Sequence, residues 1–259
     1  MAEFVNLDKK GPVGIITMNR PPANTYNLDF MKELDAAVEQ VRFDDEVKGV
    51  ILTSAIPSFF SAGADINLLN ASTPEYKASF CLYCQEVLNR MEVTPKIFIA
   101  AINGHCVGGG LEIALACDLR FMATGKGKTG LPEVKLGVLP GTGGTQRLPR
   151  LIGRSRALDL MITGTTMSAE EALNIGLINR VFPPEELMSK TVEYVEGLAK
   201  GATRSIGLIK LGVQQGIEMS LSCGLTLERE LQNRLFVTED AKEGISAFLE
   251  KREPRFKGR

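Results

Sequence analysis

The sequence predicts an α/β fold that is followed by a helical C-terminal region. In the first two thirds of the chain, short apolar runs typical of buried strands alternate with segments whose apolar residues recur at helical spacing. After Pro183 and Pro184, only amphipathic helical segments follow. The 259 residues, 44% of them hydrophobic, suffice for a large core. We therefore divide the chain into a strand-and-helix core, residues 1–190, and a helical region, residues 191–259.

The elements of both regions are predicted in chain order from these patterns. Apolar runs predict strands at 13–19, 47–54, 96–104, 118–124 and 177–182. Helical spacing predicts helices at 31–41 and 76–92, and Pro95 ends the second of them. In the C-terminal region, helices are predicted at 185–201, 204–217, 224–237 and 241–252. Helices with two apolar faces pack on a further surface, so we expect this region to contact another subunit.

Composition argues against several classes of partner and of site. A net charge of −1 gives no overall attraction to nucleic acid or to an anionic membrane. No apolar run approaches the roughly 20 residues that span a bilayer, and the N-terminus has no targeting pattern. Five scattered cysteines predict reduced thiols and a cytoplasmic protein. Cys81 and Cys84 have metal-site spacing, but without a second pair we interpret them as two residues on a helix rather than as a zinc or redox site.

Three consecutive glycines open an apolar helical segment in GHCVGGGLEIALACD, residues 104–118. Glycine permits positive φ and close backbone approach, and the N–H groups of a helix N-terminus favour negative charge. Two interpretations follow: close packing against a neighbouring strand, or an oxyanion hole made by backbone donors. Glu112 lies in this first turn among apolar residues. A carboxyl in such surroundings indicates a tuned acid or base, whereas on a surface it would only cap the helix.

Two other segments have related features. In FFSAGADINLL, residues 59–69, a free N–H near Ala64 is a candidate second donor, although Asp65 also suits a plain helix cap. Further on, Glu133 follows Pro132, and Glu112 and Glu133 together could share acid and base work. The glycine-rich run at 141–144 lacks both the dinucleotide and the P-loop fingerprints, so we predict a turn into a helix that starts near residue 145.

Taken together, these motifs identify a resemblance. The segments SAGADI, GHCVGGGLEIALACDLRF, LPEVKLGVLPGTGGTQRLPRLIG, SAEEALNIGLINRV and EGISAFLEKR occur in this order. In this combination the chain resembles the crotonase superfamily, and specifically the enoyl-CoA hydratases, over nearly its whole length. The resemblance implies a crotonase-like spiral of ββα repeats with a C-terminal helical trimerisation region. It also implies a homo-oligomer, with two trimers stacked as a hexamer.

The resemblance further implies a role for each polar group. The N–H groups of Ala64 and Gly109 would hold the thioester oxygen of an acyl-CoA. Glu112 matches the position that orients and deprotonates water, and Glu133 the position that supplies a proton to the α-carbon. Water would add across the 2,3 double bond of a 2-enoyl-CoA and give a 3-hydroxyacyl-CoA. We expect no metal and no cofactor, because the CoA is part of the substrate.

The same resemblance implies contacts with the acyl-CoA substrate. Within the chain these are Ala62, Asp65, Ile66, Asn67, Leu131 and Pro132. Phe248 and Lys251 of a neighbouring subunit would contact the CoA moiety, although Lys251 also suits a solvated charge near the chain end. Two positions depart from the family pattern: many relatives have a lysine at Asn67 and an aromatic residue at Thr129. The first departure argues against a charged CoA contact from this loop, and the second changes the acyl pocket.

Several alternatives stay open at this point. A Δ3-Δ2 enoyl-CoA isomerase generally needs one carboxylate, so the presence of both glutamates favours hydration. A hydratase of a cyclic or dienoyl-CoA is a second alternative, which the pocket region 70–91 would decide. Some relatives bind RNA through a lysine-rich helix, but the helical segment from Met31 is mostly acidic here. We therefore predict no nucleic-acid partner and no membrane partner, and the two intact carboxylates argue against a noncatalytic scaffold.

Overall fold

The computed structural model describes residues 3–125 and 127–259. Its larger sheet has six strands in the order β1-β2-β3-β5-β7-β10. The first two form an antiparallel hairpin, and every other neighbouring pair is parallel. The strands are β1 (Val5–Lys10), β2 (Val13–Met18), β3 (Gly49–Ser54), β5 (Ile97–Ile102), β7 (Leu119–Ala123) and β10 (Arg180–Phe182). The central strands β3 and β5 are mostly apolar and almost wholly buried because both faces of the sheet are covered.

A second, smaller sheet lies beside the first and has the order β4-β6-β8-β9. Its strands are β4 (Phe59–Ser61), β6 (His105–Val107), β8 (Thr129–Gly130) and β9 (Thr166–Met167). Consecutive strands of the chain alternate between the sheets: β3 then β4, β5 then β6, β7 then β8. A helix follows each of these pairs. The chain therefore winds as a spiral of ββα repeats, which confirms the predicted fold class.

Helices α1 (Leu28–Phe43) and α8 (Leu187–Ala199) pack on the larger sheet. The other helices of the spiral are α2 (Ile66–Ala71), α3 (Pro74–Val93), α4 (Gly109–Leu115), the 3-10 helix η1 (Glu133–Leu136), α5 (Gly144–Ile152), α6 (Arg154–Thr163) and α7 (Ala169–Asn174). The main apolar core lies between the sheets and α1, α3 and α4. A second core lies on the other face, under α8. Helix α8 spans residue 190, where we placed the division between the core and the helical region, and it packs on the sheet. The division itself stays a prediction.

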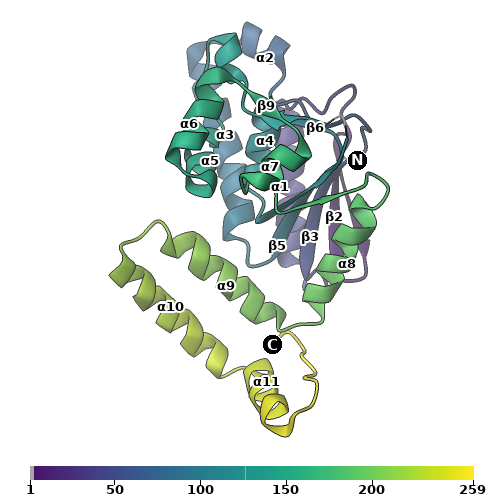
Figure 1. Ribbon diagram of the computed structural model, residues 1–259, viewed down its shortest axis with the longest axis vertical. Helices are drawn as coiled ribbons and strands as arrows, with labels where there is room; N and C mark the ends of the chain where they lie inside the picture. The colour runs from purple at the N-terminus through teal and green to yellow at the C-terminus, as the bar shows by residue number, and fades with distance from the viewer. Residues whose placement is uncertain (1–2, 126) are drawn as a thin grey trace.

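The last three helices extend away from the spiral (Figure 1). They are α9 (Thr203–Gly216), α10 (Leu221–Phe236) and α11 (Glu239–Glu250). One buried ion pair joins them to the core, between Lys210 Nζ on α9 and Asp118 Oδ2, 2.8 Å apart. The groove between α9 and α10 has a volume of about 390 Å³ and is mostly apolar. Large apolar side chains on these two helices remain exposed, among them Ile209, Val213, Ile217, Leu221 and Leu225.

The predicted elements agree with the structure apart from their ends and a set of short pieces. The last predicted strand is shorter than expected, since Leu177 and Ile178 lie in a turn that hydrogen-bonds to Ala172. Strands β1, β4, β6, β8 and β9 were not predicted as elements, nor was α6. Cys81 and Cys84 lie on α3 as free thiols, as predicted. Within the described residues, no helix has the length and apolarity to cross a membrane.

Candidate active site

The candidate site forms where three parallel strands of the smaller sheet end. Strands β4, β6 and β8 lie side by side and run in the same direction. Ala64 follows the end of β4, Gly109 follows β6, and Glu133 follows β8. Because the carboxyl ends of parallel strands meet at one edge, segments about 70 residues apart in sequence converge there. The three motifs singled out in the sequence therefore belong to one site.

The glycines at the start of α4 are required by the backbone and by its neighbours. Gly108 has φ of +57°, in the left-handed region that favours glycine. A side chain on Gly109 would collide with the hydroxyl of Tyr26, and one on Gly110 with the carbonyl of Ser61. Close packing of this turn, one of the two interpretations of the motif, is therefore confirmed. Close packing does not exclude the oxyanion-hole interpretation. The same close approach brings the N-terminus of α4 next to the loop that follows β4.

The two candidate oxyanion donors lie on adjacent segments. Gly63 has φ of +91°, and a Cβ added to it would lie 2.8 Å from the backbone nitrogen of Gly109. The Tyr26 N–H donates to the Gly63 carbonyl at 2.9 Å, and the Tyr26 carbonyl accepts from Asp65 at 3.0 Å, which fixes this segment. Within residues 3–125 and 127–259, neither Ala64 N–H nor Gly109 N–H donates a hydrogen bond to the protein. Two neighbouring free donors of this kind suit an oxygen that acquires negative charge.

Glu112 is buried, with 2% of its surface exposed. Its Oε1 accepts two hydrogen bonds, from the N–H groups of Thr142 and Gly144, each at 2.7 Å. The side chain thus points across to the loop before α5 instead of capping its own helix. Burial raises the pKa of this carboxyl, and the two N–H groups and the nearby cations Arg147 and Lys77 oppose that rise. The carboxyl group is thus fixed in position by two backbone donors.

Glu133 begins η1 and is half-buried. Its Oε2 has no hydrogen-bond partner among the described residues. Its Oε1 lies beside Gly108, 3.2 Å from where a Cβ on that glycine would be. Burial raises the pKa of Glu133 to about 7, and the negative charge of Glu112 contributes to the increase. Glu133 can therefore carry a proton near neutral pH, whereas the two N–H donors favour the ionised form of Glu112, which a general base needs.

The predicted acyl-CoA contacts flank these groups but differ in exposure. Asp65 caps α2 by accepting from the Asn67 N–H at 3.0 Å, and it also pairs with Arg20 at 3.0 Å. The helix-cap interpretation of Asp65 is thereby confirmed. Ile66 is 54% exposed, and Leu131 is buried. Ala62 and Pro132 are half-buried, and Asn67 is exposed.

The chain is similar to proteins of one family over nearly its whole length. The model of the enoyl-CoA hydratase/isomerase family matches residues 8–259. The chain belongs to this family. It is 41% identical to the short-chain-enoyl-CoA hydratase of Clostridium acetobutylicum, over 96% of this chain and 95% of that protein. It is 37% identical to the crotonyl-CoA hydratase of Syntrophomonas wolfei, over 98% of each. The solved enoyl-CoA hydratase of Bacillus anthracis superposes with a TM-score of 0.94 at 37% identity, over 99% of this chain and 100% of that one.

Two residues predicted from the resemblance to this family lie far from the glutamates. Phe248 is on α11 and is 83% exposed, and Lys251 ends that helix with φ of +56°. Helix α11 lies at the opposite end of the molecule from α4 (Figure 1). Within one chain these residues therefore do not reach the site. A contact with substrate requires a second copy, as the prediction already assumed.

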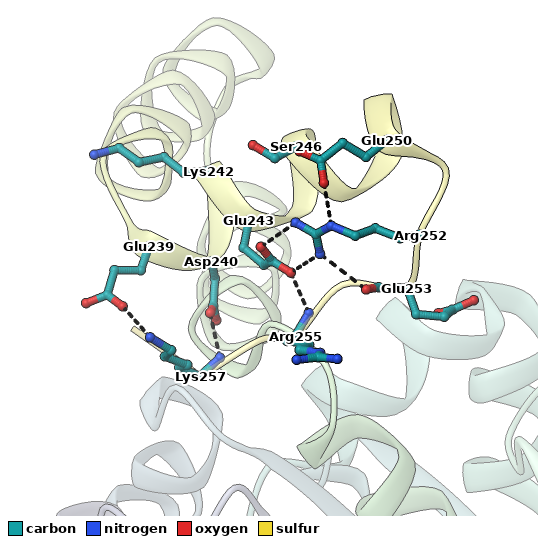
Figure 2. A pocket seen from close by; sticks show the side chains of 10 residues that line it. All are labelled: Glu239, Asp240, Lys242, Glu243, Ser246, Glu250, Arg252, Glu253, Arg255 and Lys257. Atoms are coloured by element: carbon teal, nitrogen blue, oxygen red, sulfur yellow. Dashed lines mark hydrogen bonds and ion pairs between the residues drawn. The ribbon is translucent and has the colours of Figure 1, made fainter.

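A cavity of about 950 Å³ lies beside α11 and does not include Glu112 or Glu133. Figure 2 shows that its lining is charged and that its members pair with one another. Arg252 bridges Glu243 and Glu250 at 2.6 Å each. Asp240 accepts from the N–H of Lys257 at 2.7 Å, so it fastens the C-terminal segment to the helix. The charged side chains of this cavity therefore pair with one another and hold the C-terminal segment against α11.

Sequence reasoning missed the residues that hold the Glu112 carboxylate. Thr142 was assigned only to a turn, and its N–H is one of the two donors. Tyr26 was not singled out, although its hydroxyl lies 3.1 Å from Thr142 Oγ1 and is fully buried. The glycine-rich run at 141–144 was the available signal. In this chain the run donates two N–H groups that position the Glu112 side chain.

Proposed function

We propose that the chain hydrates a 2-enoyl-CoA to a 3-hydroxyacyl-CoA with Glu112, Glu133 and the N–H groups of Ala64 and Gly109. Family membership and the names of its relatives support hydration of an enoyl-CoA as the activity. The observation that carries the residue roles is the buried Glu112 carboxyl and the half-buried Glu133 carboxyl beside two free backbone donors. One carboxyl is held by two N–H groups, and the other has a pKa of about 7.

In the proposed reaction Glu112 takes a proton from water as the oxygen bonds to the β-carbon. The electrons of the double bond move to the thioester oxygen, which becomes an enolate held by Ala64 N–H and Gly109 N–H. Glu133 then gives its proton to the α-carbon. Each donor that stabilises the enolate more than the ground-state carbonyl contributes about 100- to 1000-fold in rate. The acid and the base contribute roughly 100- to 10,000-fold each.

The test uses crotonyl-CoA and follows the loss of the enoyl-thioester absorbance. Glu112→Gln and Glu133→Gln should each lower the rate at least 100-fold, because each removes one proton transfer. Glu185→Gln is the matched control, since Glu185 is an exposed glutamate far along the chain from the site. Rates near that of the unmodified enzyme in either site variant would contradict the assigned roles.

A Δ3-Δ2 enoyl-CoA isomerase is the alternative within the same family. It needs one proton shuttle and no water, so the presence of a second carboxyl, the half-buried Glu133, favours hydration. Supplying a 3-enoyl-CoA beside crotonyl-CoA distinguishes the two activities. Cyclic and dienoyl-CoA thioesters in the same screen address the remaining alternative substrates.

We also propose a homo-oligomer, a hexamer made of two trimers, as the working state. The apolar side chains left exposed on α9 and α10 support this assembly, because surfaces of that kind normally lie in interfaces. Light scattering of the purified chain measures the assembly directly. The five free thiols support a reducing compartment such as the cytoplasm.

A further inference from the structure

The N–H groups that hold Glu112 belong to peptide units whose carbonyls are held as well. The Thr142 N–H shares a planar peptide group with the carbonyl of Gly141. That carbonyl accepts a hydrogen bond from Gln85 Nε2 on α3 at 2.8 Å. Fixing the carbonyl of a planar group also fixes the direction of its N–H. Gln85 and Glu112 therefore bind opposite ends of the same peptide unit.

Arg147 holds the next peptide of the same loop. Its Nη1 donates to the Thr142 carbonyl at 3.2 Å. The guanidinium is itself fixed by Glu92 on α3, with Nε to Oε1 and Nη2 to Oε2 both at 2.8 Å. A paired geometry of this kind sets both position and orientation. Gly143 has φ of +115°, and a side chain there would collide with this guanidinium, so the loop and Arg147 are in direct contact.

We propose that Gln85 and the Glu92–Arg147 pair are positioning residues, through which α3 and α5 hold the 141–144 loop so that it aims two N–H groups at the Glu112 carboxylate. The inference rests on the role proposed for Glu112. Gln85 and Arg147 touch no reacting atom in this scheme. They act on Glu112 through the loop. Replacing them should make the position of the Glu112 carboxylate less fixed, while the carboxylate itself remains.

The proposal has a signature in the pH dependence of the reaction. Weaker hydrogen bonds to the Glu112 carboxylate raise its pKa, so the acid side of the profile of kcat moves to higher pH. Arg147 also lowers that pKa through its charge. The titratable and charged groups that face Glu112 from the surrounding elements are Tyr26, Lys77, Cys84, Glu133 and Arg147. Gln85 carries no charge, so a shift caused by its loss reports hydrogen bonding alone.

The test measures kcat and KM for crotonyl-CoA across pH in Gln85→Met, Arg147→Lys and Arg147→Met of the full chain. Gln85→Met should lower kcat by roughly 10- to 100-fold, as expected for a weakened hydrogen bond to a charged group, with KM little changed. Its acid limb should move to higher pH. Arg147→Lys keeps the charge and loses the paired geometry, so it should lower kcat with a smaller shift than Arg147→Met.

Glu86→Gln, on the exposed side of α3 next to Gln85, is the matched control and should behave like the unmodified enzyme. Thermal unfolding and assembly size confirm that each variant is folded. Gln85→Glu is a second variant with a side chain of the same shape. When this glutamate is ionised, it cannot donate a hydrogen bond to the Gly141 carbonyl. A Gln85 variant that is folded and has an unchanged kcat and acid limb overturns the proposal. If Glu112→Gln is also active, the proposed function itself fails, so the two failures are distinguishable.

Discussion

Replacing Glu133 with glutamine is expected to stabilise the fold at alkaline pH while it removes the hydration activity. The ordinary pKa of this carboxyl is 4.5, and burial raises it to about 7 in the folded chain. The folded state therefore binds the proton more tightly than the unfolded state does. The stability from this proton is fully present below pH 4.5 and is lost as the pH rises through 7. Glutamine stays neutral at every pH and avoids this loss.

The magnitude follows from the two pKa values. A shift from 4.5 to about 7 is worth about 3 kcal/mol at about 1.4 kcal/mol per unit. Because the side chain is only half-buried, screening by solvent reduces the expected effect to roughly 1–2 kcal/mol. The free energy of unfolding of Glu133→Gln, relative to the unmodified chain, should thus be higher at pH 8 than at pH 4 by this amount.

Urea denaturation at both pH values and at one protein concentration measures this difference. Glu185→Gln is the control, since an exposed carboxyl should give the same difference at both pH values. An effect of Glu133→Gln that is equal at pH 4 and pH 8 would refute the argument. It would mean that the carboxyl titrates at its ordinary pKa and is not kept protonated by its surroundings.

Three further outcomes are expected. Above pH 7 the value of kcat should fall about tenfold per pH unit, because Glu133 loses the proton that it supplies; a flat profile up to pH 9 would contradict this. In Gly109→Ala the added Cβ collides with the Tyr26 hydroxyl, so kcat/KM should fall about 100-fold or more while the assembly keeps its size. Lys210→Met leaves Asp118 buried without its cation, so the urea midpoint should drop by the equivalent of about 3–5 kcal/mol, and adding Asp118→Asn should recover part of it.

The sequence could predict the long elements because each buries a whole apolar face. Strands β3 and β5 and helices α1 and α3 show this in their burial patterns. Strands of two or three residues, such as β6 and β8, contain too few residues to show a period of two. The strand at Val5–Lys10 was missed because its second half is polar and exposed at the sheet edge.

The candidate site shows the same contrast between features that are local in sequence and contacts between distant residues. Gly109 and Glu112 were predictable because the glycine run and the apolar helix are contiguous in sequence. The bonds from Thr142 and Gly144 to Glu112 join residues about 30 positions apart. The bond from Gln85 to Gly141 spans 56 positions. No local pattern encodes such contacts, since they depend on how successive repeats of the spiral stack.

The environments of the two glutamates explain how identical side chains can take opposite roles. Burial raises the pKa of both, but only Glu112 has two N–H donors on its carboxylate and two cations nearby. The negative charge on Glu112 in turn raises the pKa of Glu133, so the pair favours one shared proton. In the proposed reaction Glu112 gains a proton as the enolate forms, and Glu133 gives one up when the enolate is protonated, so the pair carries one negative charge before and after the reaction. In the intermediate this negative charge lies on the enolate, where the Ala64 and Gly109 donors are free to receive it.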